Sequence, residues 1–520
     1  MNKIRIAGIA VVLTAFLFII SACTKDFESI NTDPNRPGLE KADPGMLLTN
    51  AIEALSDRVH EIFLGEEMGN CWAQHEGKCQ YTDEDRYIYR TSVINATWNS
   101  FYSGSGMDVQ TLIDVAISKQ NENYRGVALV MKGYIASLLT DMFGPVPYTD
   151  AWTGAANTLP SYDSQETIYR DVIAKLDTAN AILSEEGKTI EGDILFGNDI
   201  MKWRKFANSL RMRLLLRMSA KDVQFVTTEL SKMVADPVTY PIFESNADNA
   251  ALAYLGSAPN NHPMNENRKT RDDHRVSKTL TDIMWTNSPY LDYRICLYAQ
   301  KSGNNTFEGI PNGLTSAKAL AYNGNGIKNT SKVGNYFTAK DPVNGAAAPM
   351  PPGMLMSYAE LQFILAEAAL KGYIPGGNTA AETYYYGGIY GSYAQFGDAL
   401  VAAVDGYGYL PMEGATSDSL AADFIANDVF GWDAANGMEL IGTQRWAASF
   451  DQGLQSWIEW RRTGYPVLIP AEDGANQGKI PVRFPYPTDE AARNPSSLAA
   501  GVTLLGGPDD LNTKVWWDVD

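Results

Sequence analysis

Apolar residues recur at intervals of three and four positions along most of this chain, which is the spacing of an amphipathic helix. The clearest stripe lies between residues 124 and 142 and consists of Val127, Met131, Ile135, Leu138, Leu139 and Met142. The same spacing predicts further helices over residues 47–68, 107–119, 164–183, 201–218, 221–235, 358–371, 379–403 and 435–463. The pattern therefore predicts a mostly α-helical protein.

The predicted helices of the first half follow one another after short turns. Successive amphipathic helices with short connections pack as hairpins, and stacked hairpins bury a continuous core. The tetratricopeptide consensus is poorly matched in this sequence. The pattern therefore predicts stacked tetratricopeptide-like helical hairpins without regular repeats.

The middle of the chain lacks this periodicity. From about residue 236 to 352, Pro, Gly and Asn interrupt the sequence, and only residues 276–286 have a helical pattern. An irregular segment of this length inside a folded body is uncommon unless it builds a functional surface or is mobile. We therefore expect a helical body over residues 45–520, into which an irregular, loop-rich lobe is inserted at about 236–352.

The N-terminus has the features of a secretory signal. Lys3 and Arg5 precede an apolar run over residues 7–20, and Ile20-Ser21-Ala22 leads directly to Cys23. This run is shorter than the roughly 20 residues that span a bilayer, which disfavours a transmembrane helix. The pattern predicts a lipoprotein signal peptide over residues 1–22, lipidation of Cys23, and a flexible stalk over residues 23–44.

Charge narrows the range of partners. The chain carries 42 Lys and Arg residues against 61 Asp and Glu residues, a net charge of −19. Such an excess of negative charge repels nucleic acid and anionic lipid, so neither is an expected partner. No segment after the signal has the composition of a membrane span, so the lipid on Cys23 is the expected anchor.

Three cysteines remain in the predicted mature chain besides Cys23. Cys71 and Cys79 are close enough in sequence to close a short disulfide loop outside the cytosol, and Cys296 would be left without a partner. Spacing alone fixes neither the distance nor the orientation of two thiols, so the 71–79 pair is either a disulfide or two free thiols.

Four segments in order carry a family resemblance: residues 141–148 (DMFGPVPY), 203–213 (WRKFANSLRMR), 357–368 (SYAELQFILAEA) and 444–466. Together with the upstream lipobox they resemble the SusD/RagB family of nutrient-binding lipoproteins of the Bacteroidetes outer membrane. The resemblance implies a non-enzymatic protein at the cell exterior that binds a glycan or a peptide. It also implies a partner, a SusC-like TonB-dependent transporter, to which the nutrient is delivered.

The four segments also have a structural interpretation. In residues 203–213 the apolar side chains lie on one helical face, which predicts core packing, and Glu360 and Glu367 are candidate ion-pair partners for the arginines of that segment. In residues 141–148, Gly144 permits a left-handed exit from a helix and the prolines prevent its continuation. We therefore expect these segments to support the fold and not to bind ligand.

In the family, ligand binding falls to aromatic-rich loops. This chain has such a loop between residues 69 and 102, and Trp98 within it is expected to pack in the core. Flat aromatic rings stack on sugars, while amides and charged groups read hydroxyls. The candidate ligand-binding residues are Trp72, Gln74, His75, Tyr81, Arg86 and Tyr87, with Trp285 and Tyr290 as an opposite wall. Trp72 and Tyr81 are expected to be exposed.

Enzyme and metal motifs are weak in this sequence. No nucleophile elbow, phosphate-binding loop, dinucleotide motif or His-Glu-x-x-His zinc motif is present. His75, Glu76 and Cys79 lack the second ligand pair that a zinc site needs. Residues 81–85 offer oxygen ligands for calcium, although a solvated acidic turn is the commoner outcome. No resident cofactor is expected, and the alternative function is a surface-tethered hydrolase of glycan or peptide polymers.

Overall fold

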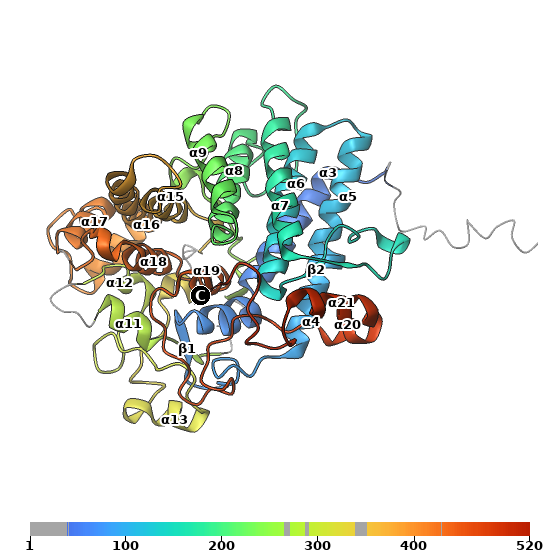
Figure 1. Ribbon diagram of the computed structural model, residues 1–520. Helices are drawn as coiled ribbons and strands as arrows, with labels where there is room; N and C mark the ends of the chain where they lie inside the picture. Colours follow the sequence, from blue (N-terminus) through green and yellow to red (C-terminus); the bar gives the residue numbers. More distant parts are fainter. Residues whose placement is uncertain are drawn as a thin grey trace, which may run out of the picture. The chain divides into compact units, whose positions relative to one another are not determined.

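The early helices are neighbours in space as well as in sequence (Figure 1). The computed structural model describes residues 39, 41–264, 271–285, 291–338, 351–427 and 429–519. The early helices are α3 (Pro44–His60), α5 (Ser105–Ser118), α6 (Glu122–Phe143), α7 (Gln165–Ile182), α8 (Ile200–Arg217) and α9 (Val223–Ala235). From α5 onward each packs against the next, and α3 packs against α5. This confirms the predicted stacking of tetratricopeptide-like hairpins.

Local capping explains where these helices begin and end. Helix α6 starts after Asn121, whose side chain accepts hydrogen bonds from the two backbone amides of Asn123 and Tyr124. Helix α7 starts after Ser164, which accepts from the amide of Thr167. Helix α6 ends at Gly144, whose φ of 84° is accessible to glycine at low cost. The predicted helix stop is therefore confirmed.

Helix α6 is long and apolar enough to cross a membrane, so the expectation that no segment after the signal has the composition of a membrane span is wrong. Its most apolar 18-residue window is 94% buried within the protein. Such a helix is the central element of a folded core, because its neighbours α5 and α7 cover it on both sides.

Short strands and helices make up the described part of residues 236–352. They are β4 (Ala250–Leu252), β5 (His274–Val276), α11 (Lys278–Met284), α12 (Ile295–Tyr298), α13 (Ser316–Ala321) and α14 (Asn335–Thr338). Strand β5 pairs antiparallel with β1 (Glu76–Lys78), and β4 pairs antiparallel with β6 (Gly353–Met356). A third ribbon joins β2 (Val146–Pro147) and β3 (Tyr162–Asp163). This segment is thus held to the helical scaffold by two small ribbons.

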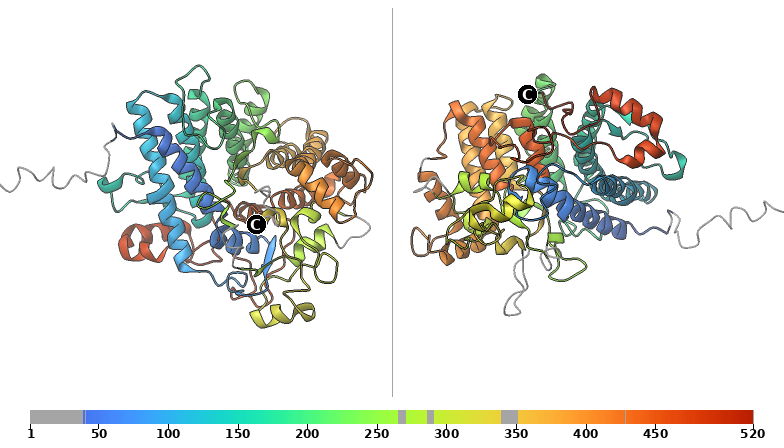
Figure 2. Two further views of the ribbon diagram at one scale, coloured as in Figure 1. Left: turned by 180° about the vertical axis from the view of Figure 1, so that it is seen from behind. Right: turned by 90° about the horizontal axis from the view of Figure 1, so that it is seen from below.

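Helices resume in the last third of the chain. They are α15 (Tyr358–Leu370), α16 (Gly377–Gly406), α17 (Ser417–Ala426), α18 (Gly437–Ala448), α19 (Gly453–Thr463), α20 (Thr488–Arg493) and α21 (Pro495–Leu505). The predicted helix over 435–463 is two helices, separated near Asp451, whose φ is 68°. Helices α20 and α21 return to the start of the chain and lie beside α4 (Thr91–Asn99) and β3 (Figures 1 and 2).

The predicted helix over 47–68 is also two elements. After α3, the chain forms a wide π-helical segment, η1 (Ile62–Asn70), which packs against α19. A side chain at Gly69 would collide with the backbone of Gly453 and Leu454, so this contact needs glycine. Residues in π-helices are often functional, and η1 brings two adjacent glutamates, Glu66 and Glu67, into the interior.

The buried apolar residues fall into two main cores. One is built on α3 and α5–α8 and is completed by α19 and the C-terminal segment. The other is built on α12 and α15–α18. Helix α15 contributes to both, because Leu361 and Ile364 belong to the first core and Phe363 and Ala366 to the second. This helix is therefore buried on more than one face, as expected for a helix between two packed layers.

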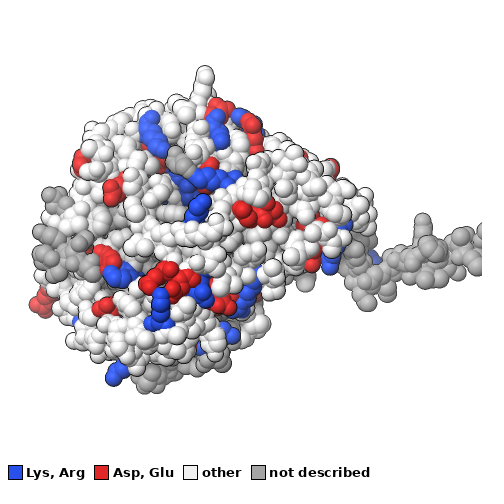
Figure 3. All heavy atoms as spheres, turned by 60° about the horizontal axis from the view of Figure 1, so that its bottom comes forward, with Lys and Arg blue, Asp and Glu red and all other residues white. Residues whose placement is uncertain are grey.

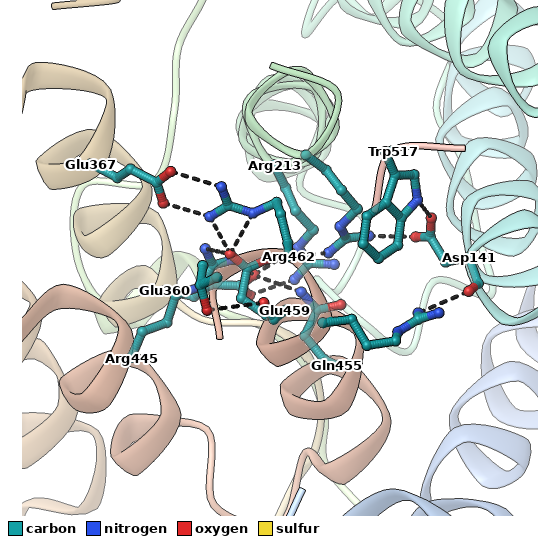
Figure 4. A network of polar contacts seen from close by, with 12 residues as sticks. Asp141, Arg213, Glu360, Glu367, Arg445, Gln455, Glu459, Arg462 and Trp517 are labelled. Carbon is teal, nitrogen blue, oxygen red and sulfur yellow. Dashed lines mark hydrogen bonds and ion pairs between the residues drawn. The ribbon is translucent and has the colours of Figure 1, made fainter. Parts of the chain in front are cut away.

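Glutamates and arginines from several helices meet in one buried network (Figure 4). Glu360 on α15 accepts hydrogen bonds from Arg213 on α8 and from Arg445 on α18, both at 2.8 Å. The predicted ion pair between residues 203–213 and Glu360 is thus confirmed. Glu367 was expected to pair with the same segment, but it binds Arg462 of α19 at 2.7 Å. Ion pairs therefore connect helices α8, α15, α18 and α19.

The network holds its carboxylates in the ionised form. Burial alone would raise the pKa of Glu360, but the guanidinium groups of Arg213 and Arg445 outweigh it and lower that pKa below its usual range. Arg462 acts in the same way on Glu367. The polar residues of this network are inaccessible to a ligand, so its role is structural.

Candidate ligand-binding cleft

The aromatic loop predicted to bind ligand is largely part of the core. Trp72 is 0% exposed and packs against Tyr87, Trp457 and Phe484, and its indole nitrogen donates a hydrogen bond to the carbonyl of Glu84 at 2.9 Å. The exposure expected for Trp72 is therefore wrong. Its neighbours Trp457 and Phe484 lie far along the chain, so local sequence gives no sign of the burial.

Gln74, His75 and Tyr87 are buried as well, which removes them from an open platform. Gln74 donates a hydrogen bond to the carbonyl of Ile469. His75 lies 3.0 Å from the carbonyl of Trp446, and burial lowers the pKa of its imidazole to about 4. The Tyr87 hydroxyl accepts from the amide of Ala471 at 2.9 Å. The polar groups of these three residues therefore form hydrogen bonds within the protein.

Three of the predicted residues remain at least partly accessible. Tyr81 is 64% exposed, as expected, and the guanidinium of Arg271 lies 5.4 Å from the centre of its ring. Arg86 donates a hydrogen bond to the carbonyl of Asp473 at 3.0 Å. Trp285 is half-buried. Tyr290 lies outside the described residues, as does the predicted lipidation site Cys23.

Residues 81–85 do not present a converging set of oxygen ligands for calcium. Asp85 is buried and accepts hydrogen bonds from the amides of Gly313 and Lys78, while Glu84 forms an ion pair with Arg90. Asp83 faces Arg86 at 3.9 Å. The carboxylates of this segment therefore serve three separate structural contacts.

The disulfide considered for Cys71 and Cys79 is absent from the structure. Both are free, buried thiols, as is Cys296. Burial raises the pKa of the Cys71 and Cys79 thiols, so both are protonated and unreactive.

A different site emerges beside the last turns of α16. Gly397, with φ of 45°, kinks this helix, and the residues after the kink face α12 and α14 across an open cleft of about 460 Å³. We name it the α16 cleft. Its lining residues are Cys296, Leu297, Ala299, Gln300, Asn335, Tyr336, Ala399, Ala402, Ala403, Gly406 and Tyr407. Its volume is in the range typical of small-molecule sites.

Small residues on α16 create the space. Ala399, Ala402, Ala403 and Gly406 have the spacing that places residues on one helical face. Because none of them extends beyond a methyl group, this face of the helix leaves room in front of its backbone. The opposite side of the same helix carries Leu400 and Val404, which are buried in the second core. The cleft is therefore a direct result of the helical pattern.

Half-buried aromatic rings border the cleft. Tyr336 and Tyr407 line it, and Lys301 lies 5.3 Å from the ring centre of Tyr407 and 4.6 Å from that of Tyr409. Tyr409 in turn contacts Trp285, with ring centres 5.7 Å apart. The predicted residue Trp285 thus belongs to an aromatic rim, although the partners predicted for it do not.

Polar groups in the cleft suit neutral hydrogen-bonding ligands. Asn335 is exposed and Gln300 is half-buried, and Gln300 uses one amide hydrogen for a bond to the carbonyl of Val333 at 2.8 Å. Burial raises the pKa of both Tyr336 and Tyr407, so their hydroxyl groups stay protonated at neutral pH. The cleft therefore combines aromatic faces with uncharged hydrogen-bonding groups.

The sequence analysis missed Tyr336, Tyr407, Tyr409 and the small residues of α16. The available signal was the series of small residues Ala399, Ala402, Ala403 and Gly406, followed by Tyr407 and Tyr409. Residues 379–403 were predicted only as a helix, because the same small side chains suit close helix packing and an open cleft. The contribution of α12 and α14 comes from a segment with no periodic pattern.

One face of the molecule shows how its charge is distributed (Figure 3). Acidic and basic side chains lie there in small groups of both signs, separated by wide areas without charged residues. Among the described residues of this face, basic side chains lie beside acidic ones and do not form a continuous basic surface.

A helical scaffold with an aromatic, uncharged cleft defines a class of ligand-binding protein, and comparison with known proteins gives the family. The family model described as starch-binding and associating with the outer membrane matches residues 34–487. The chain belongs to this SusD-like family, which confirms the resemblance seen in its four motifs. No curated protein matches the chain.

Solved structures share the fold over nearly the whole chain. A chitin-binding protein is 26% identical, with a TM-score of 0.76, and the match covers 92% of this chain and 100% of the other. An outer membrane protein from Bacteroides vulgatus, described as involved in nutrient binding, is also 26% identical, with a TM-score of 0.74 and the same coverage. A SusD homolog from Bacteroides fragilis, 23% identical, has a TM-score of 0.74 over 92% of this chain and 99% of its own.

Proposed function

We propose that this protein binds a nutrient glycan in the α16 cleft at the cell surface and passes it to a TonB-dependent transporter. The observation that carries the proposal is the pairing of half-buried rings, Tyr336 and Tyr407, with the amides of Gln300 and Asn335 in one cleft. Aromatic faces stack on the apolar faces of sugars, and amides exchange hydrogen bonds with hydroxyl groups. A peptide is the other nutrient that this chemistry admits.

The relatives support the glycan. One solved relative at 26% identity is a chitin-binding protein, and the family model is described as starch-binding. Both ligands are neutral polymers of hexose units, which an uncharged aromatic cleft suits better than an acidic or basic one. Lys301 is the one cation that the described rim brings close to the tyrosines, and it already lies against Tyr407 and Tyr409.

The composition of the cleft favours binding without catalysis. Glycoside hydrolysis usually needs two carboxyl groups on either side of the scissile bond. No Asp, Glu or His occurs among the described residues that line the α16 cleft. The alternative function, a surface-tethered hydrolase, would need acidic groups from elsewhere in the chain.

The proposal also includes a lipid anchor for the protein and a transporter that receives the nutrient. Lipidated Cys23 and the stalk over residues 23–44 would hold the folded body at the outer membrane, facing the cell exterior. A SusC-like TonB-dependent transporter is the proposed partner, because the chain would otherwise hold a nutrient without a route across the membrane. Affinity purification of the lipidated protein in mild detergent should recover a large β-barrel protein, and recovery of the protein alone would contradict this part.

Calorimetric titration of the mature protein with oligosaccharides of starch and chitin, and with mixed peptides, tests the binding site. Tyr407→Ala and Tyr336→Ala should each weaken binding about fivefold or more, since a specific aromatic contact contributes on the order of 1 kcal/mol. Tyr390→Ala is the matched control, because Tyr390 is a partly exposed tyrosine on the same helix that does not line the cleft.

The outcomes separate the alternatives. Equal affinity of all three variants would place the binding site elsewhere. Chromatography of the same mixtures after incubation reports cleavage: unchanged oligosaccharides support a binding protein, whereas turnover by the wild type would establish the hydrolase. Binding of peptides and not of oligosaccharides would replace the glycan as the ligand.

A further inference from the structure

A second cluster of reactive groups lies where η1 meets the ribbon of β1 and β5, and it shares no residue with the α16 cleft. In this ribbon Lys78 lies directly opposite His274. Glu76 is two residues from Lys78 on the same strand, so its side chain lies on the same face. The face is covered by η1, which supplies Glu67. Local pairing therefore gathers four ionisable side chains.

The cluster is fully enclosed. Glu67, Glu76, Lys78 and His274 have side chains that are 0% exposed, and Asp273 is 2% exposed. Lys78 forms an ion pair with Glu67 and lies 3.2 Å from a carboxylate oxygen of Asp273. One ammonium group thus faces two buried carboxylates.

Arg90 is a second cation at the edge of this cluster. It lies 3.5 Å from Oε2 of Glu67 and also forms an ion pair with Glu84. The buried carboxylates of Glu67, Glu76, Glu84 and Asp273 therefore outnumber the two cations Lys78 and Arg90. Buried carboxylates in excess of their cations are costly in free energy unless another positive charge joins them.

His274 is oriented in a way that metal-binding histidines share. Its Nδ1 lies 2.7 Å from a carboxylate oxygen of Glu76, so Nδ1 carries the hydrogen and donates it. That leaves the lone pair on Nε2, which points toward Glu67 at 3.9 Å. A carboxylate behind one ring nitrogen fixes the tautomer that leaves the other nitrogen free to bind a metal.

Unused acceptors converge on the same place. Within the described part of the chain, Nε2 of His274 and one carboxylate oxygen of Asp273 have no hydrogen-bond partner. The other oxygen of Asp273 and Oε2 of Glu67 have only ion-pair contacts, with Lys78 at 3.2 Å and with Arg90 at 3.5 Å. Buried polar atoms are satisfied in the great majority of cases, so a group of unsatisfied acceptors calls for a cation that they could share. Of these atoms, the ammonium of Lys78 reaches only one carboxylate oxygen of Asp273.

We propose that Glu67, Asp273 and His274 form a binding site for a divalent transition-metal cation, Zn²⁺ or Mn²⁺. One ligand atom from each residue lies within 4.8 Å of the others. In a tetrahedral zinc site the ligand atoms are roughly 3.4 Å apart, so each ligand would move inward by about 1 Å to complete the site. An imidazole ligand disfavours Ca²⁺ and Mg²⁺, which prefer oxygen alone. The ion links η1 of the helical scaffold to β5 of the loop-rich segment.

Lys78 has an alternative partner when the metal is bound. Glu84 is buried beside the cluster, and neither of its carboxylate oxygens has a hydrogen-bond partner among the described residues, although Arg90 forms an ion pair with it. An ion in this place requires the Lys78 ammonium to move away from Glu67 and Asp273, and in the proposed metal-bound state it pairs with Glu84.

Metal content and thermal unfolding of the purified mature protein test the site. After loading with Zn²⁺ or Mn²⁺ and gel filtration, elemental analysis should find one ion per chain, and removal with EDTA should lower the Tm by about 3 °C or more. Loading with Ca²⁺ or Mg²⁺ should leave no retained ion. A wild-type protein that retains neither Zn²⁺ nor Mn²⁺ would overturn the proposal.

Variants locate the ion. His274→Gln and Asp273→Asn should each abolish retention of the metal. His60→Gln is the control, because His60 is a buried histidine in α3 outside the cluster. Retention that is unchanged in both cluster variants would also overturn the proposal. If these variants fold poorly, anomalous scattering at the zinc edge from wild-type crystals locates the ion directly.

Lys78→Met distinguishes a metal site from a simple lysine ion pair. The variant leaves Glu67 and Asp273 without their ammonium partner, so its Tm should fall, and Zn²⁺ or Mn²⁺ should restore it. Lys205→Met is the matched control, because Lys205 also lies between two carboxylates, those of Glu244 and Asp248, where no histidine joins them. A Lys78→Met protein whose Tm does not respond to either metal would contradict the site.

Discussion

Trp72 packs edge-on against Trp457, with ring centres 5.5 Å apart and planes at 73°. One indole follows η1 near the start of the folded body, and the other lies on α19 near its end. Phe484 stacks on Trp457 and also touches Trp72, which makes a three-ring cluster. This contact joins the two ends of the helical scaffold.

Trp72→Ala should destabilise the protein by roughly 3–5 kcal/mol, because it opens a cavity in this cluster and removes the hydrogen bond to Glu84. Affinity for ligand in the folded fraction should be unchanged. Tyr81→Ala is the control, since Tyr81 is largely exposed and its loss should change the free energy of unfolding by less than about 0.5 kcal/mol. Denaturant unfolding followed by tryptophan fluorescence measures both, and similar midpoints for the two variants would contradict this interpretation.

The sequence predicted the helices because each depends on local spacing. The stripe at 124–142 and the helix stop at Gly144 are confirmed, since a helix needs only its own residues and its immediate neighbours. The break between α18 and α19 was missed. It depends on Asp451 adopting a positive φ, and no glycine or proline marks that position.

Glu360→Gln should lower the free energy of unfolding by about 3–5 kcal/mol at neutral pH, because Arg213 and Arg445 lose the charge that compensates their burial. Glu122→Gln is the matched control: Glu122 pairs with Arg125 on the surface, where such a pair contributes about 0.5 kcal/mol or less. Urea unfolding of both variants at pH 7 gives the comparison. Equal effects would show that the network contributes no more than a surface pair.

The effect of Glu360→Gln should also depend on pH. The pKa of Glu360 in the folded protein is below its usual value, so its contribution is complete above about pH 4.5 and is lost as the pH falls through the folded-state pKa. The difference between wild type and variant should therefore shrink below pH 4.5. A difference that stays constant down to pH 3 would mean that the charge of Glu360 is not what the variant removes.

The buried imidazole of His75 should make the free energy of unfolding depend on pH in a higher pH range than Glu360 does. Burial lowers its pKa to about 4, whereas an unfolded chain protonates histidine near pH 6.5. The unfolded state therefore gains protons first, and the wild type should lose roughly 3 kcal/mol of stability through this residue between pH 6.5 and 4. Urea unfolding at several pH values should give a flatter profile for His75→Gln. Parallel profiles of the two proteins would contradict the assignment.

Cys23→Ala should release the protein from the outer membrane, because the lipid on Cys23 is the predicted anchor. Metabolic labelling with palmitate should mark the wild type and not the variant. Cys296→Ala is the control, since Cys296 is buried and its pKa is raised to about 12 by burial, and this variant should keep its label. A Cys23→Ala protein that still carries palmitate and sediments with the membrane would rule out the lipobox.

The binding site was harder to predict than the fold. The density of aromatic residues around Trp72 predicted a binding loop. The exposure of Trp72 depends on the residues that pack against it, and these, Trp457 and Phe484, come from distant segments. Trp285 was predicted as part of an opposite wall of the ligand site; it is half-buried and contacts Tyr409, and its role in binding stays a prediction. The α16 cleft exists because the side chains on one face of α16 are small. A sequence pattern shows which residues are present, but it does not show where the folded chain leaves an open space.

The buried charge network has a consequence for the order in which the chain can fold. Arg213 lies on an early helix, whereas its carboxylate partner Glu360 follows much later in the chain. Arg217 pairs with Asp141 of another early helix, but it also faces the late residue Glu459. A chain that has been synthesised only as far as its first helices carries Arg213 without its carboxylate, and it cannot bury that charge at low cost. The part of the core around Arg213 therefore forms only after the chain has been synthesised beyond Glu360.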